Sequence, residues 1–284
     1  MRLVSYNIQY GFGRDGRYDL RRAIDAVAGA DIIALQEVER HWRRTRMDDQ
    51  PALIGRWLSD RYWTYAPALD VDASTLDAAG RIVNRRRQHG QMIVSRWPIL
   101  SSRMLILPKL DTGPTFNFAT GALEAVIAAP VGSIRVYNVH LGYVSPEERK
   151  IQASALCEFM RRAPEEGGVW TGQDADPGHW QTDDPPPPMP RPAMLMGDFN
   201  SEADDEEMRL LAGAGEGLID AWQHLSGEAR AGVTFRADPC RGVPRDLHID
   251  HVLVTSHLAP RLRRCWIDAT TEASDHQPVW VELD

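Results

Sequence analysis

Six short segments, spread over the whole chain, each place polar side chains at the edge of an apolar run. They are Ser5-Tyr6-Asn7, Leu35-Gln36-Glu37, residues 138–141, residues 197–200, Ile249-Asp250-His251 and Ser274-Asp275-His276. Apolar runs such as residues 31–35 and 193–196 are hydrophobic enough to be buried strands. The polar residues that follow them should emerge where a sheet ends, and several such edges together predict one shared site.

Length and composition predict one substantial domain with a negative charge. The chain has 284 residues, of which 43% are hydrophobic, and the six segments span it, so we expect a single domain over residues 1–284. The net charge of −8 argues against a protein that grips long nucleic acid by neutralising its phosphates. A local groove for nucleic acid stays possible. Arginine clusters at residues 40–46, 81–87 and 261–264 are either solvated surface or contacts for a substrate phosphate.

The cysteines and the N-terminus indicate a reducing compartment. Cys157, Cys240 and Cys265 are odd in number and far apart, which favours buried thiols over a disulfide framework. The chain opens on a strand-like segment without an apolar signal region, and no apolar run is long enough to span a bilayer. Unless a leader has been removed, we expect a soluble, cytoplasmic monomer.

Local patterns predict strands interrupted by a few helices. Asp19 can cap a helix to about residue 28, and Ser145 with Pro146 and Glu148 forms a capping box for a helix to about residue 162. Further helices are expected at residues 50–59 and 204–212. Short strands are expected at residues 92–95, 100–107, 122–128, 134–139, 249–255, 262–267 and 279–282. Hairpins as well as crossovers favour stacked mixed sheets covered by helices.

Two segments have the composition of irregular structure. Residues 69–89 are polar, small and arginine-rich, which predicts a long surface loop. Residues 164–192 are rich in proline and glycine, with four consecutive prolines from Pro185, and predict an excursion without helix or strand. Trp170 and Trp180 either pin this excursion to the body or help to wall a substrate cleft.

The residue types in the six segments suit phosphoester chemistry. A phosphodiester repels nucleophiles through its own negative charge. Enzymes usually neutralise this charge with hard divalent cations, which take oxygen ligands. Glu37 is the strongest candidate ligand, because an unpaired carboxylate at a buried strand edge is costly without a cation or donor nearby. Asp198 and Asn200 share a face if extended, after a glycine where the chain should turn, although they could instead cap the following helix.

The last two segments offer an acid and base. Asp275 and His276 supply a carboxylate and an imidazole able to act as a general base, with Asp250 as the candidate orienting group. A zinc site at His248 and His251 is disfavoured, because residues three apart on a strand face opposite sides and no thiolate is placed to help.

Together and in this order, the six segments resemble the endonuclease/exonuclease/phosphatase superfamily, whose members include deoxyribonuclease I, apurinic endonucleases, neutral sphingomyelinases and inositol polyphosphate phosphatases. The resemblance implies an α+β fold, a four-layer α/β/β/α sandwich of two mixed, largely antiparallel sheets. It implies Mg²⁺ or Mn²⁺ as cofactor. It implies metal binding by Asn7, Glu37 and Asp275, and catalysis by His140, Asp198, Asn200, Asp250 and His276.

Some positions depart from relatives. Gln9 replaces an acid, and His140 a tyrosine, that are usual in the apurinic endonucleases, which points away from that branch. Thr120-Gly121 stands where several relatives have Arg-Gly, and Gln91 stands where many have asparagine, so one phosphate contact and one hydrogen bond are expected to differ. The implied metal ligands and the acid/base pair are all present.

The sequence therefore predicts a magnesium-dependent hydrolase that cleaves a phosphoester, preferably a diester, by in-line attack of water. The alternatives are a phosphomonoesterase acting on a sugar or inositol phosphate, and a catalytically silent binding module on the same scaffold. The substrate is a phosphoester of unspecified identity: the net charge does not favour nucleic acid, and without a hydrophobic anchor no stable membrane insertion is expected.

Overall fold

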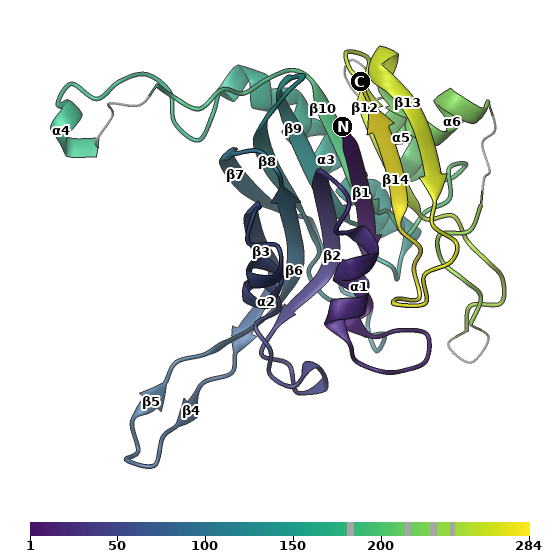
Figure 1. Cartoon of the computed structure of the whole chain (residues 1–284). Coiled ribbons are helices and arrows are strands. Elements are labelled where there is room, and N and C mark those ends of the chain that lie inside the picture. The colour runs from purple at the N-terminus through teal and green to yellow at the C-terminus, as the bar shows by residue number, and fades with distance from the viewer. Residues whose placement is uncertain (181–184, 214–216, 228–231, 239–241) are drawn as a thin grey trace.

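The computed structural model describes residues 1–180, 185–213, 217–227, 232–238 and 242–284, and its centre is a pair of six-stranded mixed sheets (Figure 1). The first sheet has the order β13 (Leu262–Ile267), β14 (Val279–Leu283), β1 (Arg2–Asn7), β2 (Ile32–Arg40), β6 (Arg86–Ser95) and β3 (Tyr62–Asp72). The second has the order β11 (Leu218–Asp220), β12 (Asp250–Thr255), β10 (Ala193–Asp198), β9 (Gly132–His140), β8 (Gly121–Ala129) and β7 (Ile99–Ile106).

Three hydrophobic clusters hold four layers together. Between the sheets, Leu3 and Ile32 of the first pack with Val136 and Met194 of the second. Outside the first sheet lie α1 (Leu20–Val27) and α2 (Gln50–Trp57), and outside the second lie α3 (Pro146–Glu166) and α5 (Glu206–Gly213). The shorter helical elements are η1 (Gln9–Gly11), η2 (Arg43–Thr45), α4 (Pro177–Trp180), α6 (Ala221–Ser226) and η4 (Ala259–Arg261). The four-layer sandwich implied by the resemblance is confirmed.

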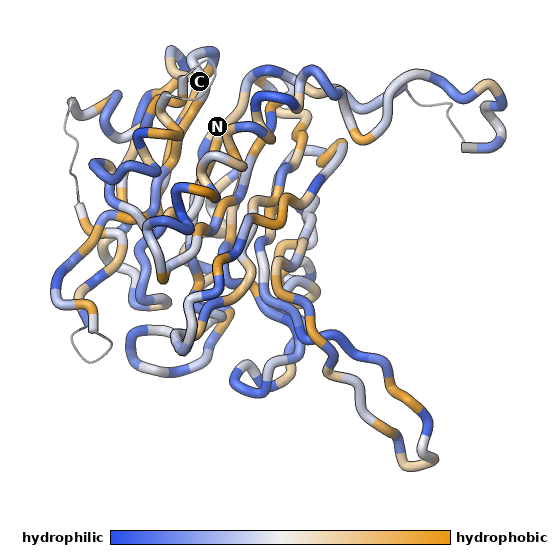
Figure 2. Tube along the Cα trace, turned by 180° about the vertical axis from the view of Figure 1, so that it is seen from behind, coloured by the Kyte–Doolittle hydropathy of each residue, from blue (hydrophilic) through white to orange (hydrophobic). Residues whose placement is uncertain are grey.

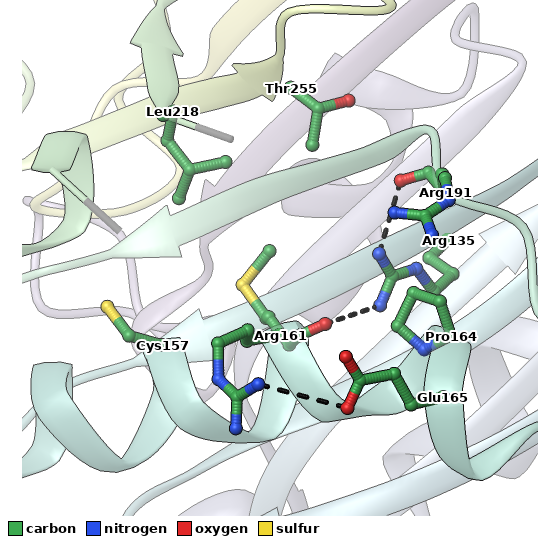
Figure 3. Close-up of a pocket in the computed structure, with 10 residues that line it drawn as sticks. Arg135, Cys157, Arg161, Pro164, Glu165, Arg191, Leu218 and Thr255 are labelled. Atoms are coloured by element: carbon green, nitrogen blue, oxygen red, sulfur yellow. Dashed lines mark hydrogen bonds and ion pairs between the residues drawn. The ribbon is translucent and has the colours of Figure 1, made fainter. Parts of the chain in front are cut away.

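The long helix α3 starts as predicted and ends later. The Ser145 hydroxyl accepts a hydrogen bond from the Glu148 amide at 3.3 Å, as an N-cap should. The helix then runs to Glu166 although Pro164 lies inside it. Pro164 has no N–H to give to the Met160 carbonyl, and Arg135 Nη1 donates to that oxygen instead, at 2.9 Å (Figure 3). The arginine thereby satisfies the carbonyl oxygen that the proline leaves without its helical donor.

The prediction of a surface loop at residues 69–89 is wrong. Strands β3 and β6 continue as a pair to Asp72 and Arg86, and β4 (Thr75–Leu76) with β5 (Ile82–Val83) extends the ribbon away from the body (Figure 1). Both faces of this ribbon are exposed to solvent, so its strands need no alternation of apolar and polar residues. The hydrophobic pattern therefore could not indicate these strands. Its tip exposes hydrophobic side chains between hydrophilic stretches (Figure 2).

The proline-rich excursion also holds more structure than its composition suggested. It begins inside α3 and contains the single helical turn α4, so the expectation of no helix is wrong there, while residues 181–184 lie outside the described part. The described part leaves the body where β10 begins, at the end of the sheet opposite to Asp198 (Figure 1). It therefore does not wall the site described below. Trp170 is 42% exposed, and the side chain of Trp180 is not among those described.

Two of the three cysteines are described, and both are free thiols. Cys157 and Cys265 are half-buried, where buried thiols were expected, and Cys240 lies outside the described residues. Within the described ranges no helix is long and apolar enough to cross a membrane.

Candidate active site

Five strand ends, two from the first sheet and three from the second, bring the polar segments together. Strands β1 and β2 run parallel and carry Asn7 and Glu37 near their ends. Strands β9 and β10 also run parallel, so that His140 lies directly beside Asp198 in the register. On the other side of Asp198, antiparallel β12 begins with Asp250. Residues in register on neighbouring strands point to the same face, so these three side chains share one face.

A bulge in β2 aims Glu37. The register between β2 and β6 shifts between Leu35 and Val38, and Glu37 has a φ of 60°, in the left-handed region that such residues seldom adopt. Bulges of this kind redirect a side chain and are frequent beside active sites. The strain is local and is held by the pairing on both sides of the bulge.

Asn7 connects the carboxylates of the two sheets. Its amide Nδ2 donates to Glu37 Oε1 at 3.2 Å and to Asp198 Oδ2 at 3.0 Å. Its Oδ1 accepts from the Gln9 amide at 3.0 Å. In this orientation the amide nitrogen, and not the oxygen, faces the site, so Asn7 acts as a donor that fixes two acids.

His276 lies between two acids. Its Nδ1 is 2.8 Å from Asp250 Oδ2, and its Nε2 is 3.6 Å from Asp198 Oδ2. The Ser274 hydroxyl accepts from the His276 amide at 3.2 Å and donates to the Asn7 carbonyl at 2.7 Å, which ties this loop to β1. The acid/base pair expected from the sequence is thus brought together.

The two histidines beside Asp198 are driven to opposite charge states. Burial lowers the pKa of His140 to about 4, and the neighbouring His89 and His276 push in the same direction. Burial also acts to lower the pKa of His276, but the charges of Asp250 and Asp198 outweigh it and raise that pKa to about 10. At neutral pH His140 is neutral and His276 carries an extra proton. Opposite shifts of neighbouring groups are typical of acid/base sites.

Asn200 orients Asp198 through its backbone. Its amide N–H donates to Asp198 Oδ1 at 2.9 Å, and its side-chain Nδ2 donates to the Leu141 carbonyl at 2.9 Å. The turn lies at Asn200, whose φ is 50°, and not at Gly197 as expected. Gly197 is required for a different reason, because a Cβ there would lie 1.9 Å from the Val139 carbonyl oxygen. Helix α5 begins only at Glu206, so Asp198 and Asn200 do not cap it.

Other polar residues of the six segments join the sheets beneath the site. Gln36 Nε2 donates to Asn138 Oδ1 at 2.7 Å across the two sheets. Asn138 Nδ2 in turn donates to the carbonyls of Leu35 and Met92, at 2.8 and 2.9 Å. Gln91 also bridges the sheets, because its amide donates to the Gly121 carbonyl at 2.9 Å. These buried amides are structural, and they set the distance between Glu37 and Asp198.

Sequence reasoning missed Glu39 and His89, which are both buried and lie opposite each other on β2 and β6. The only signal in the sequence was a charged and a titratable residue inside otherwise apolar strands. Of the arginine clusters, the first contributes Arg44, whose guanidinium pairs with Glu39. In the third, Arg263 pairs with Asp284 at the end of the chain.

The family model described as the endonuclease/exonuclease/phosphatase family matches residues 4–276, which is nearly the whole chain and includes every site residue described above. The chain belongs to this family. Members are hydrolases that act on phosphoesters, and they generally use a divalent metal ion. No curated protein matches the sequence.

Solved structures of the endonuclease/exonuclease/phosphatase family share the fold at low identity. A family protein from Beutenbergia cavernae is 18% identical with a TM-score of 0.65, covering 99% of this chain and 70% of its own. A Neisseria 3' phosphatase bound to a product DNA hairpin is 19% identical with a TM-score of 0.59, covering 100% and 99%. A mannosyl-6-phosphatase from Bacteroides thetaiotaomicron is 16% identical with a TM-score of 0.60, again covering 100% and 99%.

The acids around Glu37 fit a hard cation. Burial is the main reason that the pKa of Glu37 rises to about 7, and the nearby charge of Asp275 adds to the rise. Two mutually repelling carboxylates at a partly buried edge are the arrangement that a divalent cation relieves, and carboxylate oxygens are ligands that Mg²⁺ accepts. Glu37 and Asp275 can therefore hold the metal that the family uses.

A second group of acids and imidazole lies beside it. Asp198, Asp250 and His276 are buried, with ligand atoms within 4.8 Å of one another, and form the only such cluster among the described residues. The closeness of His276 and Asp250 is already explained by their hydrogen bond, and an imidazole nitrogen suits Zn²⁺ better than Mg²⁺ or Mn²⁺. This group is therefore suited to proton transfer, and the Glu37 side to a hard cation.

The expectation that His248 and His251 face opposite sides is wrong, since His248 precedes β12 and the ring centroids are 4.8 Å apart. They still make poor zinc ligands. His251 uses both ring nitrogens, with Nδ1 3.2 Å from Asp220 Oδ2 and Nε2 3.0 Å from the Ser201 carbonyl.

A separate cavity of about 170 Å³ lies under the C-terminal part of α3, lined by residues that include Arg135, Cys157 and Thr255 (Figure 3). Arg135 precedes His140 on β9 by roughly 16 Å, at about 3.3 Å per residue. This cavity is therefore distinct from the active-site edge.

Proposed function

We propose that the protein is a divalent-metal-dependent phosphodiesterase that cleaves its substrate by in-line attack of water. The observation that carries this proposal is the series Asp250, His276, Asp198, Asn7 and Glu37, which is joined by hydrogen bonds and by one ion-pair contact of 3.6 Å between His276 and Asp198, and which connects the two sheets. Such a series supplies proton donors and acceptors beside a cluster of acids suited to a cation, as phosphoester hydrolysis requires.

Each side chain takes a role that follows from its contacts. Glu37 and Asp275 would hold Mg²⁺ or Mn²⁺, with Asn7 fixing Glu37; the ion would neutralise charge that develops on the phosphate oxygens. His140, neutral and buried, would donate to a phosphate oxygen. Asp198, oriented by the Asn200 amide, positions the attacking water.

Proton transfer falls to the pair of Asp250 and His276. Asp250 holds the Nδ1 proton and thus directs Nε2 of His276 toward the side of Asp198. Asp198 takes the proton from water, or His276 does after it has lost its extra proton. A pH–rate profile of Asp198→Asn distinguishes them, since a rate limb that survives this change belongs to the imidazole.

Aromatic side chains at the rim favour a diester over a monoester. The ring centroid of Phe118 lies 6.4 Å from that of His140. The ring centroids of Phe116 and Tyr143 lie 5.8 and 6.0 Å from that of Phe118, and these two residues are 70% and 45% exposed. A diester carries a second substituent that can lie on this surface, whereas a monoester does not need it. The net charge of −8 favours a small or flexible diester over long nucleic acid.

The test compares bis-p-nitrophenyl phosphate with p-nitrophenyl phosphate, each with Mg²⁺, with Mn²⁺ and with chelator. We expect metal-dependent release from the diester that exceeds release from the monoester at least tenfold, and none with chelator or in Glu37→Ala. A reversed preference would support a phosphomonoesterase on a sugar or inositol phosphate, which the likeness to the Bacteroides mannosyl-6-phosphatase makes the second candidate. Absence of metal-dependent release from every ester of a wider panel would favour a silent binding module.

A further inference from the structure

A buried series of charged residues runs from the surface to the active site. Arg44 is 41% exposed at its side chain, and its guanidinium pairs with the carboxylate of Glu39, whose side chain is fully buried. Glu39 Oε1 is in turn 3.3 Å from His89 Nδ1. The guanidinium also lies over the ring of Tyr10, 3.9 Å from its centroid, which holds it in place.

His89 lies beside the groups assigned to the metal and the phosphate. Its ring centroid is 6.5 Å from that of His140 and 5.1 Å from that of Phe118. A charge on His89 lowers the pKa of both Glu37 and His140, so the ring lies within electrostatic reach of both. The mechanism above makes no use of it.

One atom of His89 has no hydrogen-bond partner among the described residues. The residue is 5% exposed, and its Nε2 is buried and unbonded. Buried polar atoms in native proteins almost always have a partner, and exceptions are frequent where a ligand binds. Nδ1 faces a carboxylate that only accepts, so Nδ1 holds a proton and Nε2 is the atom left for a ligand.

On the Arg44 side of the ring, the charges favour an anion. Glu39 is the single carboxylate between two basic groups, Arg44 and His89, so one negative charge is shared by two potential cations. Resting on the proposed function, we propose that His89 is a further substrate-binding residue, which as an imidazolium donates from Nε2 to a non-bridging phosphate oxygen beside His140. Glu39 and Arg44 are positioning residues that hold the ring.

Three substitutions of His89 separate this role from packing. His89→Phe keeps a ring against Phe118 but has no nitrogen. His89→Asn keeps an amide near Glu39 but cannot reach the place of Nε2, and His89→Gln can. We expect kcat/KM to fall about 100-fold in the Phe and Asn variants, as for loss of one preorganised donor, and to recover to within about tenfold in the Gln variant. His41→Phe is the matched control, because His41 bonds the Arg86 carbonyl on the exposed side of the same ribbon.

Glu39 is tested through its coupling to His89. Glu39→Gln should lower kcat/KM about tenfold alone and no further in the His89→Phe background, because a positioning residue acts only through the ring it holds. Additive losses would mean that Glu39 acts independently of the ring, and would overturn its role as a positioning residue. Equal activity of wild type and His89→Phe, with matched melting temperatures, would overturn the proposal.

A second readout does not depend on turnover. Binding of inorganic phosphate in the presence of Mg²⁺, measured by calorimetry, should weaken about tenfold in His89→Phe and remain close to wild type in His89→Gln and His41→Phe. If wild type hydrolyses no ester but binds phosphate through His89, the proposed function fails and the His89 site stands. If phosphate binds equally to wild type and His89→Phe, the His89 site fails and the proposed function stands.

Discussion

Two regions of the second sheet both bury charged residues, but they treat them differently. Around the middle of β8 and β9, in a region that we call the stable end because Arg135 links it to the cavity under α3, Arg103 donates to both oxygens of Glu124, at 2.7 and 3.0 Å, and Tyr137 donates to the same carboxylate at 2.5 Å. Arg135 Nη1 donates to the Tyr137 hydroxyl at 2.9 Å. At this end the carboxylate has its counter-charge within the protein.

At the other end of β9 and β10, acids outnumber their counter-charges. Glu37, Asp198, Asp250 and Asp275 converge there, Glu37 has a left-handed backbone, and burial raises the pKa of Glu37 and of Asp250. The stable end thus pairs its charges within the protein. This second region, which we call the active end, keeps unfavourable charges in place for a ligand. Departures of this kind from local consistency mark functional sites.

The largest expected effect breaks the active end. Glu37→Ala, Asp198→Asn and His276→Ala should each lower kcat on a phosphodiester at least about 1,000-fold, because preorganised charge supplies most of the rate enhancement in such sites. The free energy of unfolding, from urea titration, should change by less than about 1 kcal/mol in Asp198→Asn. Full activity in all three variants would remove the site from the edge where we place it.

The next effect breaks the other end. Glu124→Ala leaves Arg103 and Tyr137 buried without their acceptor, and losing one partner of a buried ion pair costs about 3–5 kcal/mol. We expect that loss in the free energy of unfolding by urea, with kcat within about twofold of wild type at a temperature where the variant is folded. A loss of kcat as large as that of the Glu37 variant would mean that the two ends are not independent.

The sequence predicted one of these ends far better than the other. Asn7, Glu37, Asp198 and Asp250 could be assigned to one site because each follows or starts a short apolar strand, and such strand ends meet at one edge. The arrangement of Glu124, Tyr137 and Arg103 depends on which strands pair and in which register, and that is set by contacts between distant parts of the chain. No local pattern encodes it.

The same limit explains the details that were missed at the active end. The bulge at Glu37 shifts the register by contacts with β6, so the face on which Glu39 lies could not be read from a period of two. The pairing of Glu39 with His89 joins residues on two strands that are separated by a long ribbon. Gln36 and Asn138 were recognised as polar members of the segments, but their partners lie across the interface between the sheets.

A smaller effect sharpens the contrast through a thiol beside the cavity at the stable end. Burial raises the pKa of Cys157 to about 11, and its thiol lies 3.8 Å from the Leu210 carbonyl. Since the thiolate is the reactive form, iodoacetamide at pH 8 should modify Cys157 about 100-fold more slowly than an ordinary cysteine with a pKa near 9. The measurement uses the Cys240→Ser/Cys265→Ser protein. The rate should rise about tenfold per pH unit up to about pH 11; a plateau below pH 9 would show that the thiol is not shielded.

The smallest effect concerns what the active end costs the fold. In chelator at pH 8, Glu37→Gln removes a partly buried carboxylate that Asp275 repels but keeps an oxygen to accept from Asn7. We expect the free energy of unfolding to rise by about 1–2 kcal/mol, since relieving strain at a functional site commonly stabilises a protein. With Mg²⁺ the wild type should become more stable than Glu37→Gln. A ligand that binds only the native state raises the melting temperature of the protein, and the amide of the Glu37→Gln variant binds Mg²⁺ more weakly than the Glu37 carboxylate does. Glu124→Gln, the matched change at the other end, should destabilise the protein with or without Mg²⁺. If Glu37→Gln also destabilises the protein in chelator, the carboxylates at the active end are already balanced by counter-charges within the chain. The two ends would then not differ in how they compensate buried charge.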